Sequence, residues 1–155
     1  MIIVFWDLNE TDLGYMNDFV LGKKVDLGEF TLSEQEIIEF AKAFDPLEFH
    51  TSIEAAKKTI FKGLIASGPH IFHYIYKKEW VPRFGKTVIC GTGVKEWKFI
   101  KPVRPGQKIK VEVTIIGMKP EETTGGTAIN WLFEFRNEKG EIVQVLQTEV
   151  VHKNP

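Results

Sequence analysis

The sequence contains a single cysteine, Cys90, among its 155 residues. One cysteine excludes an internal disulfide, and free thiols are typical of a reducing compartment. The chain also lacks an excess of either charge, since 20 basic residues stand against 21 acidic ones. This balance argues against nucleic acid as the main partner, because nucleic-acid binding needs a basic surface.

Long hydrophobic runs are absent as well. The apolar segment Met1–Phe5 has no basic leader, and Asp7 and Glu10 interrupt it. We therefore expect neither a signal peptide nor a membrane span, and a cytoplasmic protein is the default interpretation. No internal repeat or low-complexity segment divides the chain, and its length suits one domain over residues 1–155.

The first half of the chain predicts short helices. Residues 1–30 are expected to be loop and edge strand, with a strand over Lys23–Phe30. Ser33 and Glu36 form a capping box, which starts a helix that should end near Asp45 because Pro46 disfavours helical geometry before it.

Two further helices are expected downstream. Ser52 caps a short helix over Ile53–Lys58. The pair Gly68 and Pro69 starts another, because proline suits the first helical position. This last helix is apolar almost all round over Ile71–Tyr76, which is typical of a buried helix, and Pro82 is expected to end it.

The second half of the chain changes to the period of two that is typical of strands. A polar loop is expected at 117–126 and a tight turn at 137–140. The short connections predict an antiparallel sheet packed on the buried helix, which is an α+β fold. The predicted strands cover 87–100, 109–115, 129–135 and 142–152.

Asp45 and His50 flank a short turn that can bring their side chains together. The following loop leads to the amino end of the buried helix at Gly68, whose unpaired amides could hold a thioester oxygen that gains charge. Such a set could add water to an unsaturated thioester. The same residues also suit purely structural roles, with Asp45 in a turn and His50 half-buried.

Several motifs in order strengthen the catalytic interpretation. The segments Phe44–His50, Ala55-Ala56, Phe61–Gly68 and Val94–Gly106 resemble the MaoC-like dehydratases, the (R)-specific enoyl-CoA hydratase family. The resemblance covers about Thr31–Pro155. It implies a single hotdog fold, in which a long antiparallel sheet wraps a central helix.

The resemblance also implies roles and partners. Asp45 and His50 are the expected catalytic residues that activate water, and Ser67 and Gly68 are the expected substrate-binding residues, with the Gly68 amide on the thioester carbonyl. The substrate is an acyl-CoA or an acyl carrier protein thioester, no cofactor or metal is expected, and a homodimer is implied. The best-studied hydratases carry Asp-x-Asn-Pro-x-His, whereas no asparagine lies between Asp45 and His50 here.

Three alternatives remain open. A hotdog thioesterase would release free CoA thiol as its product, and a non-catalytic acyl-CoA-binding module would account for the missing asparagine. A metal hydrolase could use His70 and His73 with the Asp45 pair, although no metal motif supports it. The basic residues of 95–104 suit either CoA phosphates or a solvated strand face.

Overall fold

The computed structural model describes residues 19–154 of the chain. The expectations for Met1–Phe5 and for the loop before Phe19 therefore lie outside the described residues. The elements in chain order are β1 (Lys24–Phe30), α2 (Glu34–Phe44), α3 (Glu48–Thr51), α4 (Ile53–Lys57), α5 (Gly68–Ile75), the π-helical turn η1 (Tyr76–Trp80), α6 (Val81–Phe84), the 3₁₀ turn η2 (Gly85–Thr87), β2 (Val88–Phe99), β3 (Ile109–Glu121), β4 (Gly126–Arg136) and β5 (Ile142–His152).

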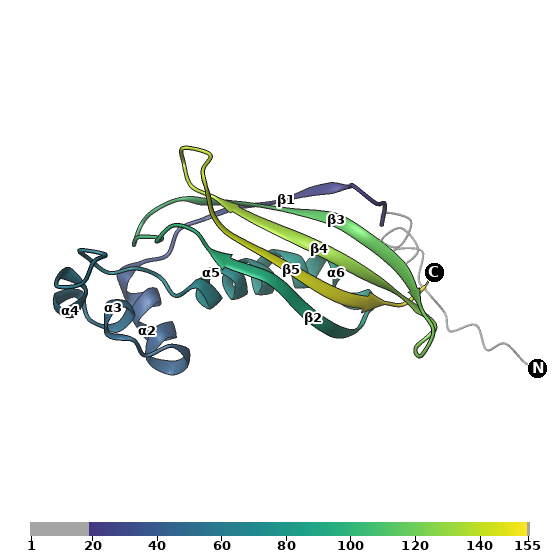
Figure 1. Ribbon diagram of the computed structural model, residues 1–155, viewed down its shortest axis with the longest axis horizontal. Helices are drawn as coiled ribbons and strands as arrows, with labels where there is room; N and C mark the ends of the chain where they lie inside the picture. Colours follow the sequence, from purple (N-terminus) through teal and green to yellow (C-terminus); the bar gives the residue numbers. More distant parts are fainter. Residues whose placement is uncertain (1–18, 155) are drawn as a thin grey trace, which may run out of the picture.

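The strands form one five-stranded sheet in the order β1-β3-β4-β5-β2. Every neighbouring pair is antiparallel. Figure 1 shows the run from α5 to α6 lying along one face of the curved sheet, with α2, α3 and α4 gathered beyond the amino end of α5. This arrangement confirms the α+β prediction and is that of a hotdog fold.

Alternating side chains of β4 build the centre of the core. Ile129, Trp131, Phe133 and Phe135 are fully buried, because side chains two positions apart share one face of a strand. Phe72 of α5 meets this face edge-on, with its ring 5.3 Å from that of Phe133. The period of two in the sequence of β4 therefore marks the face of the strand that packs against the helix.

The start of α2 confirms the predicted capping box. The Glu36 amide donates to Ser33 Oγ at 3.2 Å, and the Ser33 amide donates to Glu36 Oε2 at 2.7 Å. Two of the amides that a helix start leaves unpaired are thus satisfied. The helix ends at Phe44 with Asp45 as its C-cap, as Pro46 predicts.

The predicted end of the central helix at Pro82 is wrong. The helix widens into a π-helical turn over Tyr76–Trp80 and then resumes as α6, with Pro82 in its first turn. Proline is tolerated there because the first amides of a helix need no intrahelical acceptor. Trp80, fully buried, packs edge-on against Trp131 with ring centres 5.4 Å apart.

The polar loop predicted at 117–126 is also wrong. β3 continues to Glu121 and β4 begins at Gly126, so only a short tip joins them. Glu121 closes this tip by accepting the amides of Thr123 and Thr124 at 3.1 and 2.8 Å. The β3 arm is largely exposed over 116–120, so the alternation that marks a half-buried strand is missing there.

Candidate active site

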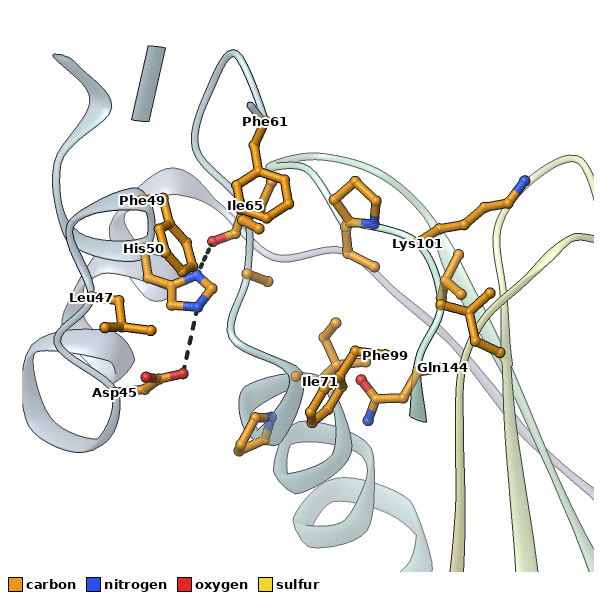
Figure 2. A pocket seen from close by; sticks show the side chains of 17 residues that line it. Asp45, Leu47, Phe49, His50, Phe61, Ile65, Ile71, Phe99, Lys101 and Gln144 are labelled. Atoms are coloured by element: carbon orange, nitrogen blue, oxygen red, sulfur yellow. Dashed lines mark hydrogen bonds and ion pairs between the residues drawn. The ribbon is translucent and has the colours of Figure 1, made fainter. Parts of the chain in front are cut away.

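Asp45 and His50 meet at the end of α2. Asp45 is the C-cap of α2, and His50 lies in the four-residue helix α3, which the sequence did not predict. The amide of Leu47 donates to the Asp45 carbonyl at 2.8 Å, and the His50 amide donates to the Leu47 carbonyl at 2.9 Å. This tight connection leaves His50 Nε2 3.5 Å from Asp45 Oδ2 (Figure 2).

A backbone carbonyl orients the buried His50 ring. His50 Nδ1 lies 2.8 Å from the carbonyl oxygen of Ile65, and the side chain is only 7% exposed. A carbonyl oxygen only accepts, so Nδ1 carries a hydrogen and donates. In the neutral ring, Nε2 is then an unprotonated acceptor that faces Asp45.

The hydroxyl of Ser67 contacts the same carboxylate oxygen of Asp45. Ser67 Oγ donates to Asp45 Oδ2 at 2.7 Å, and Ser67 is 1% exposed. Ser67 is also the N-cap of α5, yet its side chain does not cap the helix. Its observed contact is therefore with Asp45, and its assignment to substrate binding stays a prediction.

Gly68 begins α5 beneath an aromatic ring. A Cβ atom at Gly68 would overlap the Phe99 side chain, so only glycine fits under the ring in this position. The amide of Gly68 is among those that a helix leaves without an intrahelical acceptor, and it lies at the positive end of the helix dipole. The structure thus presents a backbone donor close to the Asp45 and His50 pair.

Asp45, His50 and Gly68 line one pocket of about 400 Å³. Figure 2 shows Asp45 and His50 on one side, with Phe99, Gln144 and Lys101 across from them. The remaining lining is mostly apolar: Leu47, Phe49, Phe61, Ile65, Ala66, Pro69, Ile71, Ile100, Pro102, Val103 and Val143. An apolar pocket with a few polar groups is typical of a small-molecule site.

Two lining residues, Phe99 and Gln144, were not predicted from the sequence as part of the site. A signal existed for Gln144, because it shares the inward face of β5 with Leu146 and Val150, both buried. A polar glutamine is unusual on the face of a strand that points into the core, so its position there suggests a function. No comparable signal marks Phe99, since its contact with Gly68 joins distant parts of the chain.

His70 and His73 lie apart from the catalytic pair. They line a separate recess with Phe40, Phe44 and Tyr74. His70 stacks on Phe40 with ring centres 4.3 Å apart, and burial lowers the pKa of His70 to about 4. Within residues 19–154, no group of three or more His, Cys, Asp or Glu side chains is arranged to hold a metal ion.

The basic residues near the pocket already have partners. Lys98 Nζ lies 2.6 Å from Glu96 Oε2, and Lys101 Nζ lies 2.6 Å from Glu141 Oε1. Arg104 donates to the carbonyl of Phe61. Over the described part of the chain, no helix has the length and hydropathy needed to cross a bilayer.

Residues 18–130 match the protein family described as MaoC like domain. The uncharacterized protein YdeM of Bacillus subtilis is 30% identical over 113 residues, which cover 72% of this chain and 79% of YdeM. Mesaconyl-CoA hydratase of Cereibacter sphaeroides is 33% identical over 73 residues, which cover 46% of this chain and 21% of that enzyme.

Solved structures agree with these matches. The MaoC-like dehydratase from Rhodospirillum rubrum is 29% identical and superposes with a TM-score of 0.78 over 90% of this chain and 97% of that one. The R-hydratase PhaJ1 from Pseudomonas aeruginosa shares the fold at 20% identity, with a TM-score of 0.72 over 91% of this chain and 86% of that one. This chain belongs to the family of MaoC-like hydratases and dehydratases.

Proposed function

We propose that this protein hydrates and dehydrates acyl thioesters, interconverting a 2-enoyl-CoA and a (3R)-3-hydroxyacyl-CoA. The observation that carries the proposal is the 3.5 Å separation between His50 Nε2 and Asp45 Oδ2 inside an apolar pocket. With a neutral ring both atoms are acceptors, so a water molecule that lies in the pocket beside both atoms can donate one hydrogen to each. That water is held and polarised at once.

The addition of water then proceeds in balanced steps. The water oxygen bonds to C3 of the enoyl group while His50 Nε2 takes one proton. The electron pair of the double bond moves through C2 onto the thioester oxygen, next to the Gly68 amide. C2 then takes a proton back from the Asp45 and His50 pair, and the net change is the addition of one water. Acid–base and oxyanion groups each contribute about 10²–10⁴-fold in such reactions.

The comparisons support the reaction class. Mesaconyl-CoA hydratase and the R-hydratase PhaJ1 are named for hydration, and mesaconyl-CoA is a CoA thioester. The family's asparagine, which would orient the catalytic pair, is missing here. In this chain Ser67 holds the Asp45 side chain and the Ile65 carbonyl holds the His50 side chain. These contacts favour a working pair over a non-catalytic binding module.

The direct test mixes the protein with crotonyl-CoA and follows loss of the conjugated thioester absorbance. We expect turnover, with kcat reduced by about 10²–10⁴-fold in Asp45→Asn. Asp26→Asn is the matched control, because Asp26 is exposed on β1 and pairs with Lys110. Full activity in Asp45→Asn would refute the assignment. Release of free thiol in place of hydration would identify a thioesterase.

The proposal includes a homodimer of single-domain chains. Within the described residues, β2 is an edge strand that pairs only with β5. Its apolar side chains Ile89 and Val94 are 39% and 57% exposed, and an exposed edge of this kind favours pairing with another chain. Light scattering on the purified protein should give twice the mass of the chain, and a monomer at assay concentrations would refute the dimer.

A further inference from the structure

Gln144 carries a buried amide that the described structure leaves unused. The residue is 1% exposed. Its Nε2 atom has no hydrogen-bond partner among residues 19–154. Leaving a buried donor unpaired costs about 1–3 kcal/mol, so such a group needs an explanation. A ligand oxygen that pairs with the amide would supply one.

The position of Gln144 ties it to the amino end of α5. Gln144 on β5 is the direct cross-strand partner of Phe99 on β2, so the two side chains stand next to each other on one face of the sheet. The Phe99 ring in turn lies against Gly68. Figure 2 shows the Gln144 amide beside this ring, inside the pocket that also holds His50.

The amino end of α5 is short of donors. Pro69 has no amide hydrogen, and the amides of His70 and Ile71 already donate to the Ser67 carbonyl at 3.1 and 3.4 Å. Gly68 is therefore the backbone donor left in this first turn for a ligand. An oxyanion is held best by several preorganised donors, and removal of one typically costs about 10²–10³-fold in rate.

We propose that the side-chain amide of Gln144 is the second donor to the thioester oxygen, acting with the backbone amide of Gly68. Gln144 thus becomes a catalytic residue of the proposed hydratase reaction, and the inference rests on that function. The amide keeps both its protons throughout and stabilises the charge that forms on the oxygen. Phe99 is 60% exposed, so its ring can turn outward and admit the thioester between the two donors.

The first experiment compares Gln144→Met with Gln147→Met. Methionine has a similar length and no donor. Gln147 lies on the same strand with the opposite orientation, half-exposed, and is the matched control. For crotonyl-CoA hydration we expect kcat to fall about 10²–10³-fold in Gln144→Met, with a smaller change in KM. The melting temperature should hold or rise, because the variant removes an unpaired buried amide.

A lowered melting temperature together with unchanged kcat would overturn the proposal, because Gln144 would then be structural. An equal loss of kcat in Gln147→Met would also overturn it.

The second experiment needs no turnover. Acetoacetyl-CoA forms an enolate with a near-ultraviolet absorption band, and an oxyanion site favours this form. We expect the wild-type protein to strengthen the band and Gln144→Met to lose most of the increase. An equal band in both proteins would overturn the role of Gln144. If the wild-type protein strengthens the band but does not hydrate crotonyl-CoA, the proposed function fails while the band comparison still decides the role of Gln144. Absence of any binding by the wild-type protein would overturn both.

Discussion

A histidine is buried near each end of the central helix, but of these two residues only His50 lines the pocket of the candidate site. At the amino end, His50 lies between the Ile65 carbonyl and the Asp45 carboxylate. At the carboxyl end, His152 is fully buried beside Trp131, and its Nδ1 lies 2.8 Å from Thr87 Oγ1. Burial alone therefore does not make a site, since chemistry also requires an acidic partner and room for a ligand.

The largest expected effect compares these two histidines directly. His50→Gln should lower kcat/KM for crotonyl-CoA by about 10²–10⁴-fold, because it removes the acceptor for the proton of water. His152→Gln should leave kcat/KM of the same order as in the wild-type protein, because His152 does not line the pocket. Steady-state assays on the two variants check this. Equal losses of kcat/KM in both variants would show that His50 has no special role in the reaction.

Gly68→Ala tests how tightly the amino end is built. The new Cβ would overlap the Phe99 ring, and because that ring is 60% exposed and can turn aside, the cost should be about 1 kcal/mol, the low end for overpacking. The double variant Gly68→Ala with Phe99→Ala should recover part of that loss, because the ring is gone. Urea unfolding of both proteins measures this, and a double variant less stable than Gly68→Ala would show that the clash is not the cause.

Acid should destabilise the carboxyl end through His152. Burial lowers the pKa of His152 from 6.5 to about 4. Below its unfolded pKa the unfolded chain binds a proton that the folded chain does not, so stability is lost as the pH falls from 6.5 towards 4. The loss amounts to about 2 kcal/mol by about pH 5.

The variant His152→Phe should flatten this pH dependence only partly. Burial also lowers the pKa of His70 to about 4, so the second histidine keeps a slope of the same sign. Unfolding free energies at neutral pH and at about pH 5 provide the measurement. If the unfolding free energy of His152→Phe changed between the two pH values as much as that of the wild-type protein, the assignment to His152 would be contradicted.

Local patterns in the sequence were enough for much of the fold. The capping box at Ser33, the start of α5 at Gly68 and the alternation in β4 are all confirmed, because each depends on residues close in the chain. The continuation of the helix past Pro82 was missed. This continuation includes the contact of Trp80 with Trp131, which joins residues distant in the chain and leaves no local pattern in the sequence.

The candidate site also combines features that local sequence predicted with contacts between distant residues that it did not predict. The sequence placed Asp45 and His50 at a turn, and the structure brings them to 3.5 Å, while their catalytic roles stay a prediction. The Ile65 carbonyl has no side-chain signal, because every residue carries one. The contact of Phe99 with Gly68 was equally hidden, since 31 positions separate them. Gln144 alone was open to prediction, from its place on the inward face of β5.

The smallest expected effect compares two serines at the starts of two helices. Ser33→Ala should lower the unfolding free energy by about 1 kcal/mol, which is typical for loss of an N-cap. It should leave kcat/KM unchanged, because the far end of α2 is held separately by the Asp45 amide on the Ala41 carbonyl at 2.9 Å. Ser67→Ala, the same substitution at the start of α5, removes the donor to Asp45 and should lower kcat/KM by about tenfold, the equivalent of one hydrogen bond to a charged group. Thermal unfolding and steady-state kinetics on both variants decide the matter. If Ser67→Ala kept full activity while Ser33→Ala lost it, the polar contacts at the amino end of α5 would not be what positions Asp45.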